Sequence, residues 1–596
     1  MNPRLPLILA GFTVCALATQ AHAVEPKAQV RGDLDGDLRR QLERAIGETG
    51  EAPASRFEAR RRARSAVQAA TDLLRSEGYY QSRVEDDVEG EDQPVAVVRV
   101  EPGQRFTLAQ SLILWTTPAP DEETARQVSD DLGLEVGQPG RAADILAAEG
   151  RIVAGLTRYG YADARAEPRR VVVDHADFSV QPNFNIASGP LVLMDGVRLR
   201  TFGPTEADWV ASLAPWQERD RFDPEDLAEL ERRLIDTGVY ENVAVALTPR
   251  EQTDDQGLRP VIVTLTDRPR RLLEAGATWA TTDGFGVDVF QTRYNRLKRA
   301  DTLRYGLRYA SIDSRLGGEL RLPHWRRAGR NLNLSSWLVH EETDAYDRTA
   351  LTLNADLSQR IGKTSYFSYG LGVDAGHYTE RRFDPVTHAP ITFDRDLAIL
   401  TARGSAYMDR SNDPLDPTTG YRFDISVQPT AVTGADNVFF LRSLATASAY
   451  LPVQDNARTV LAGRIRIGSI IGGEELTVPS DRMFFSGGGG SVRGYSYQSI
   501  NPRWPDNTPR GGLSLFETAL EVRRDIGEKF QAVAFVDAGA IGFQETPNLT
   551  NMRYGAGVGV RYKLPFGPVR ADIAVPLNKR EGDSDFQLYL SIGQAF

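Results

Sequence analysis

The second half of the chain, from about residue 270 onward, alternates apolar and polar residues with a period of two. Segments 303–309, 421–428 and 554–562 each place aliphatic and aromatic side chains on one face and Arg, Asp, Ser or Gly on the other. This period is typical of β-strands with one apolar face and one polar face. At about 20 residues per strand and connection, the remaining residues make about 16 strands, and even counts are the rule for bacterial membrane barrels.

A soluble β-sandwich would alternate in the same way, so the period alone leaves the class open. Three further features favour a transmembrane antiparallel β-barrel. The polar face carries Arg and Gly, aromatic residues are scattered along the apolar face, and the chain ends in Phe596. The glycine-rich run Phe484–Tyr497, which contains Arg493, lies late in this region. We interpret it as a loop that folds into the lumen of the barrel.

The first half of the chain contains three similar units. Gly78, Gly160 and Gly238 lie about 80 residues apart, and each follows a helical pattern and precedes a strand pattern. In the third unit, Asp223 is a plausible N-cap, Pro224 fits the first helical position and Gly238 fits the C-terminal cap. Each unit is therefore predicted to be a small α+β domain of order β-α-α-β-β.

The sequence predicts the following domains and helices. The domains are a signal peptide over 1–23, repeat units over 24–105, 106–186 and 187–268, and a barrel over 269–596. In the first two repeats, helices are expected near 38–46, 57–75, 122–132 and 142–158.

The N-terminus has the features of a secretory signal. A basic residue, Arg4, precedes the apolar run 5–18 and the small-residue pattern at 21–23, which predicts cleavage after Ala23. The only cysteine, Cys15, lies inside this segment, so an exported mature chain would be stabilised without disulfides. We expect a protein of the bacterial envelope.

Several function classes find no support in the sequence. A net charge of −11 argues against a nucleic-acid partner. Ser491 lies in a glycine-rich segment, but Arg493 occupies the final position that a nucleophile elbow gives to glycine. No phosphate-binding loop occurs, and the histidines lack zinc-ligand spacing. We therefore predict no enzyme activity, no metal site and no cofactor.

Several motifs together are similar to a known superfamily. The three repeats resemble polypeptide-transport-associated (POTRA) domains. The four residues Val492, Arg493, Gly494 and Tyr495 resemble the luminal-loop motif of outer-membrane assembly and secretion barrels. Segments 413–420, 535–539, 557–561 and 566–570 also match. Within the superfamily, three repeats most resemble the TamA group, the outer-membrane subunits of translocation and assembly modules. BamA proteins usually carry five repeats and two-partner-secretion transporters two.

The resemblance implies a site and partners. Arg493 would reach two acidic groups on the barrel wall, for which Glu521 and Asp537 are the candidates. This network could gate the loop or only anchor it. The implied function is insertion of unfolded outer-membrane protein clients, with a TamB-like protein anchored in the inner membrane as partner. The implied location is the outer membrane, with the repeats in the periplasm. The alternatives are a secretion channel of the two-partner type and a structural tether that supports lipid transport between membranes.

Insertion also requires a weak seam, because backbone groups of an incoming strand cannot stay unpaired in lipid. The seam would join the first strand, around 272–281, to the last, 586–596. Gly276 in the first strand and Gly593 in the last could weaken packing there or could only shape bulges. Phe596 ends an apolar face of the last strand and resembles the signal by which such barrels are themselves recognised.

Overall fold

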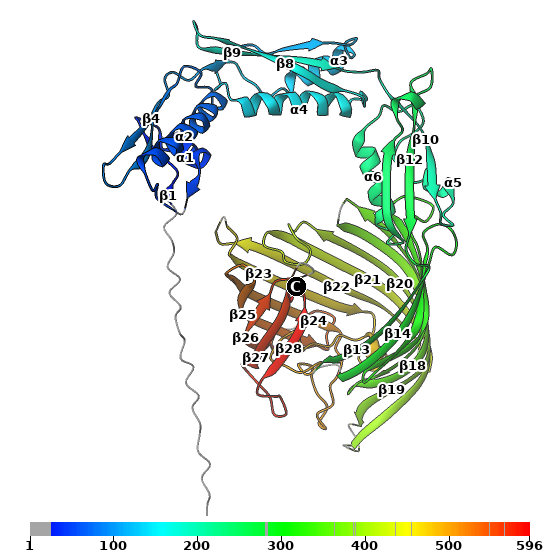
Figure 1. The fold of residues 1–596 in the computed structure, drawn as a ribbon. Helices are drawn as coiled ribbons and strands as arrows, with labels where there is room; N and C mark the ends of the chain where they lie inside the picture. The colour runs from blue at the N-terminus through cyan, green and yellow to red at the C-terminus, as the bar shows by residue number, and fades with distance from the viewer. Residues whose placement is uncertain are drawn as a thin grey trace, which may run out of the picture. The chain divides into compact units, whose positions relative to one another are not determined.

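The computed structural model describes residues 25–49, 51–280, 284–362, 364–384, 387, 389–435, 437–454, 456–547, 549–564 and 567–596. The predicted signal peptide lies outside these residues. An N-terminal α/β region is followed by a 16-stranded antiparallel sheet that curves into a barrel (Figure 1). This confirms the predicted fold class and strand number. Among the described helices, none combines the length and the apolar character needed to cross a bilayer.

Contacts within the chain divide it into two compact units, and the division passes through the third repeat. The first unit extends to Asp195 and includes Trp216–Asp226 and Thr248–Pro260. The second unit comprises Gly196–Pro215, Leu227–Leu247 and Val261–Phe596. The predicted domain boundaries near residues 105, 186 and 268 stay predictions.

Among the described residues, the N-terminal region contains three groups of strands and helices, whose strands form four small sheets. The elements of the first are β1 (Glu25–Pro26), β2 (Gln29–Arg31), α1 (Gly36–Ile46), β3 (Glu48–Thr49), α2 (Arg56–Ser76), β4 (Arg83–Glu89) and β5 (Val95–Glu101). Those of the second are β6 (Thr107–Leu108), β7 (Leu112–Trp115), α3 (Glu122–Asp130), α4 (Ala142–Arg158), β8 (Arg165–Asp174) and β9 (Ser179–Ala187). Those of the third are β10 (Leu193–Thr201), α5 (Ala207–Ala211), α6 (Pro224–Ile235), β11 (Tyr240–Leu247), the short 3-10 helix η1 (Arg250–Gln252) and β12 (Leu258–Asp267).

Local sequence explains where these helices begin and end. Asp223 accepts a hydrogen bond from the Glu225 backbone N–H at 2.9 Å, as an N-terminal cap does. The three signature glycines all adopt positive φ, at +95° for Gly78, +102° for Gly160 and +73° for Gly238. Glycine adopts this left-handed conformation without the penalty that a Cβ brings, so each repeat leaves its second helix at the same kind of residue.

The barrel strands follow one another around the sheet in chain order. They are β13 (Arg271–Ala280), β14 (Gly284–Tyr294), β15 (Thr302–Ala310), β16 (Asp313–Leu322), β17 (Arg330–Glu342), β18 (Tyr346–Ile361), β19 (Ser365–Asp384), β20 (Ala389–Asp409), β21 (Gly420–Gly434), β22 (Val438–Pro452), β23 (Thr459–Ile471), β24 (Ser514–Ile526), β25 (Phe530–Gly542), β26 (Arg553–Tyr562), β27 (Val569–Pro576) and β28 (Gln587–Ile592). The connection between β23 and β24 is a long loop with one short 3-10 helix, η2 (Ser480–Arg482).

The outer face of the barrel is apolar, as the alternation predicts. Leu307, Leu316, Leu338 and Leu351 lie opposite one another across four neighbouring strands, and all four are exposed. Side chains of the other parity point inward, and on β24 to β27 these include buried Arg, Asp and Glu. The polar loop between β23 and β24 packs against this inner face.

Candidate functional site

Arg493 lies in the loop between β23 and β24 and contacts three carboxylates of the barrel wall. Its Nε and Nη2 atoms donate to the two oxygens of Asp537 on β25 at 2.7 and 2.8 Å. Its Nη1 atom donates to Glu521 Oε1 on β24 at 2.6 Å and to Asp572 Oδ2 on β27 at 3.3 Å. The guanidinium carbon also lies 3.4 Å from the ring centroid of Phe535. Two parallel hydrogen bonds to one carboxylate are the geometry that a planar guanidinium favours.

The carboxylates around Arg493 have further cationic partners. Arg523 Nε donates to Glu521 Oε2 at 2.9 Å, and Arg561 pairs with Asp572. All of these side chains are buried. The cluster therefore holds three carboxylates and three guanidinium groups, and the buried Arg570 lies 4.0 Å from Asp572 as a fourth cation. Contacts between opposite charges and multiple hydrogen bonds make a buried ionic cluster tolerable, because each ion loses its hydration on burial.

Two glycines allow the loop to approach the wall closely. A Cβ on Gly555 of β26 would lie 1.8 Å from the carbonyl oxygen of Arg493, so any side chain there would displace the loop. Gly494 has a φ of +98°, and a Cβ on it would lie 2.8 Å from the carbonyl oxygen of Val575. Glycine at these positions is a steric requirement of the loop conformation.

The motif also contacts the last strand of the barrel. The hydroxyl group of Tyr589 on β28 accepts a hydrogen bond from the Gly494 backbone N–H at 3.1 Å and donates one to the Tyr495 carbonyl at 2.8 Å. Gln587 Nε2, also on β28, donates to Ser496 Oγ at 3.0 Å. The loop therefore holds β28 from its inner face.

A second part of the same loop is bound to strands β18 and β19. Asp481 accepts from Arg348 Nη1 at 2.9 Å, and Arg482 Nη2 donates to Asp374 Oδ2 at 2.5 Å. The Ser480 backbone N–H donates to Glu380 Oε1 at 2.9 Å. Since β18 and β19 are far from β24 to β27 in strand order, the loop is fixed at two separate places on the wall.

Among the residues that the structure describes, the first and last strands of the sheet are each paired with one neighbour. β13 pairs with β14 and β28 pairs with β27, and among the described residues no backbone pairing joins β13 to β28. Gly276 of β13 faces Asp288 of β14, whose carboxylate would lie 2.9 Å from a Cβ at that position. Gly276 therefore accommodates an acidic neighbour within the first pair of strands.

The last strand is shorter than predicted, because the chain turns at Gly593. This residue has a φ of +94° and its N–H donates to the Pro568 carbonyl at 2.7 Å. The prediction that Phe596 ends the apolar face of the last strand is therefore wrong. The carbonyl oxygen of Phe596 accepts from Arg523 Nη2 at 3.2 Å, and its ring packs beside the buried Tyr450. Phe596 thus lies against the inner wall, next to the arginine that also holds Glu521.

Comparison with known proteins identifies the superfamily. A family model described as "Omp85 superfamily domain" matches residues 295–596, which is half of the chain. The chain belongs to the Omp85 superfamily. A second family model, described as "POTRA domain TamA domain 1", matches residues 27–102.

Two curated relatives and one solved structure show how far the similarity of this Omp85 chain extends. "Outer membrane protein assembly factor BamA" of Neisseria meningitidis serogroup B is 20% identical over 89% of the chain and 72% of its own length. The protein of that name from Neorickettsia risticii is 23% identical over 61% of the chain, which spans half of that relative. A crystal structure of BamA from Haemophilus ducreyi lacking POTRA domains 1-3 superposes with a TM-score of 0.65 at 18% identity. The superposition covers 81% of this chain and 99% of the BamA chain. At this identity it shows a similarity of fold.

The structure brings some predicted site residues of this Omp85 chain together and separates others. Arg493, Glu521 and Asp537 form one cluster, and Val492, Gly494 and Tyr495 pack beside it. Gly276 and Gly593 lie on the two end strands, which do not pair with each other among the described residues. Sequence reasoning missed Asp572, Arg523, Arg561 and Tyr589. Asp572 and Tyr589 lie on the inward parity of their strands, so alternation could have selected them as wall residues.

Proposed function

We propose that this chain is an outer-membrane assembly factor of the TamA type, which inserts β-barrel clients by pairing their strands at the seam between β13 and β28. The repeats would extend into the periplasm, and a TamB-like protein anchored in the inner membrane would be the partner. The match of residues 27–102 to the TamA-type POTRA family supports this subtype. No catalytic step, metal or cofactor is part of the proposal.

One observation carries the proposal: in the sheet formed by the described residues, β13 and β28 are each paired with one neighbouring strand, whereas every other strand is paired on both sides. An incoming strand cannot leave its N–H and C=O groups unpaired in hydrocarbon. A free strand edge offers those groups the partners they need. The seam is therefore where a client strand could enter the bilayer with its hydrogen bonds satisfied.

The loop between β23 and β24 favours an assembly factor over a secretion channel. A channel for an unfolded chain needs an open lumen, whereas this loop is bound at two places on the inner wall by buried ionic and hydrogen-bonding groups. The contact of Tyr589 with Gly494 and Tyr495 also places the loop next to the seam strand. We infer that loop position and seam strand are coupled.

Photo-crosslinking from the seam tests the proposal. A photoreactive residue at Leu273 of β13 should capture unfolded outer-membrane proteins in growing cells, because this side chain is 69% exposed on a strand with a free edge. The matched control is the same residue at Leu338 of β17, which is 50% exposed but lies between two paired strands. Equal client capture at both positions, or capture at neither, would contradict insertion at this seam.

A further inference from the structure

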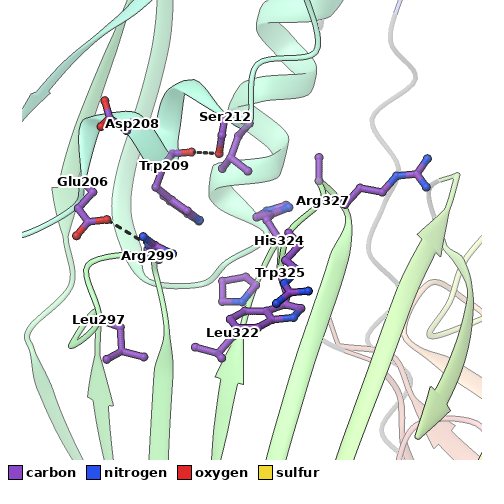
Figure 2. Close-up of a pocket in the computed structure, with 14 residues that line it drawn as sticks. Glu206, Asp208, Trp209, Ser212, Leu297, Arg299, Leu322, His324, Trp325 and Arg327 are labelled. Atoms are coloured by element: carbon purple, nitrogen blue, oxygen red, sulfur yellow. Dashed lines mark hydrogen bonds and ion pairs between the residues drawn. The ribbon is translucent and has the colours of Figure 1, made fainter.

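A cavity of about 880 Å³ lies where the third repeat meets the turns of β14–β15 and β16–β17. All of these residues belong to the second compact unit. Figure 2 shows side chains of the α5 region, among them Trp209 and Ser212, approaching Leu322, His324 and Trp325 from the barrel. The cavity is distinct from the luminal cluster around Arg493, which none of its lining residues touches.

One side of the cavity continues the apolar outer face of the barrel. Leu322 is the last residue of β16 and shares its outward parity with Leu316, which is 55% exposed. Leu297, in the turn after β14, is 53% exposed and also lines the cavity. If the outer face contacts acyl chains, as the proposed membrane location requires, one chain can follow these leucines into the cavity.

Charged side chains of both signs also line the cavity. Arg299 Nε lies 3.2 Å from Glu206 Oε2, and both side chains are largely exposed. An exposed ion pair is weak and exchanges readily for a ligand that offers both charges. Arg326 lies 5.7 Å from the Trp325 ring centroid and, among the described residues, has no carboxylate partner. Asp208 adds a second carboxylate to the lining.

Two tryptophans line the cavity together with these apolar and charged side chains. Trp209 is buried, and its ring centroid lies 6.2 Å from that of His324. Trp325 comes from the barrel turn. Tryptophan combines an apolar ring with an N–H donor and is enriched where a protein meets the boundary between hydrocarbon and water. The cavity therefore combines the three kinds of side chain that a membrane lipid can contact: aliphatic, interfacial and charged.

We propose that this cavity binds one glycerophospholipid with a zwitterionic amine headgroup, of the phosphatidylethanolamine class. Arg326 and Arg299 would contact the phosphate, Glu206 and Asp208 would accept hydrogen bonds from the ammonium group, and one acyl chain would lie along Leu297 and Leu322. An anionic lipid without an amine would leave the carboxylates repelling its phosphate. A choline headgroup would offer no N–H donor to them. This inference rests on the proposed membrane location but not on client insertion.

Native mass spectrometry of the full mature chain, released from nanodiscs of defined lipid, tests the proposal. The wild-type chain should retain one phosphatidylethanolamine and retain phosphatidylglycerol and phosphatidylcholine less. Arg326→Glu should retain the lipid about tenfold less, which corresponds to the loss of a charge-assisted hydrogen bond. Arg321→Glu is the matched control, since Arg321 is an exposed arginine of β16 that does not line the cavity, and it should behave as wild type.

The other outcomes are equally informative. A chain that incorporates into nanodiscs but retains no lipid, retains phosphatidylglycerol equally, or responds alike to both substitutions overturns the lipid site alone. A chain that does not incorporate into nanodiscs contradicts the proposed membrane location as well. Soluble phosphoethanolamine and inorganic phosphate serve as further ligands. If inorganic phosphate protects the cavity from hydrogen exchange as well as the lipid does, the site is a simple anion site and the proposal is wrong.

Discussion

Arg493 holds its loop through a cluster that would be costly to disturb. A buried ion pair is weak evidence of net stabilisation, because desolvation offsets most of the attraction between the charges. Removing one member is different, since the remaining charges then stay buried without compensation. Arg493 contacts Glu521, Asp537 and Asp572 at once, so this single side chain links three strands to the loop.

Replacing Arg493 by Ala should therefore release the loop. The cost should be about 3 kcal/mol, because Asp537 loses its bidentate partner in a buried setting. Limited proteolysis should cut within 484–497 in the variant and spare the wild-type chain. Arg524→Ala is the control, since this neighbour of Arg523 is exposed on the outward parity of β24. Unchanged protection of the loop in Arg493→Ala would refute the anchoring role.

His324 provides a pH-dependent contact between the third repeat and the barrel. Its Nδ1 atom accepts from the Gly329 N–H at 2.9 Å, so in the neutral ring Nε2 carries the proton and donates to the Arg233 carbonyl at 2.9 Å. Burial lowers the pKa of His324 below its ordinary value, and the carbonyl of Arg233 opposes this only in part. The neutral form is the one that fits, because a proton on Nδ1 would face the Gly329 N–H.

This contact should weaken as the medium is acidified. A depressed folded-state pKa contributes stability that is present above the unfolded pKa of about 6.5 and is lost as the pH falls from there through the folded value. The protection factors for amide exchange at 323–329, which correct for the intrinsic change of rate with pH, should fall between pH 7.5 and 5 in the wild-type chain. His324→Gln, which cannot be protonated, should show no such fall over that interval. An equal pH response in both chains would show that another group is responsible.

At the scale of elements, the loop between β23 and β24 acts on the last strand through Tyr589. The Tyr589 hydroxyl makes one hydrogen bond to Gly494 and one to Tyr495, and the side chain is 5% exposed. Because β28 pairs with β27 alone among the described strands, these contacts supply part of what a second neighbour would give.

Tyr589→Phe should loosen β28 and leave the cluster around Arg493 in place. Loss of two hydrogen bonds worth about 1 kcal/mol each should speed amide exchange within 587–592 by about tenfold or more. Tyr562→Phe on β26 is the matched control, because that side chain is exposed on the outward parity and should change nothing. If exchange in β28 stays at the wild-type rate, the loop and the last strand are not coupled through Tyr589.

Sequence periodicity could predict much of these elements but not their register or their turns. Glu521 and Asp537 were predictable, because the alternation of apolar and polar residues assigns both to the polar face of their strands. The superfamily's sequence motifs also identify those strands. Asp572 was not predictable, because its place beside Arg493 depends on the stagger of β27 against β26. The inward turn before Phe596 depends on the positive φ of Gly593, and glycine populates both signs of φ equally well. Apolar parity therefore extended the predicted strand four residues too far.

At the scale of the whole molecule, the described strands of the barrel form fifteen neighbouring pairs, and no pairing between β13 and β28 is seen among them. The last residues after Gly593 turn to the inner wall, where Gln594 Nε2 donates to Asp416 Oδ1 at 2.9 Å. The residues after β28 are thus held at the inner wall by contacts of Gln594 and Phe596.

A covalent link across the seam should separate folding from function. Cysteines at Leu273 of β13 and Leu590 of β28, both exposed, can be joined by a bis-maleimide of adjustable length. The linked barrel should keep its resistance to unfolding in cold detergent, because its paired strands are unchanged, and it should lose client assembly. Cysteines at Leu338 and Leu351, which face each other on β17 and β18, provide a link that leaves the seam free and should preserve assembly. Full assembly by a completely linked seam would eliminate strand entry between β13 and β28.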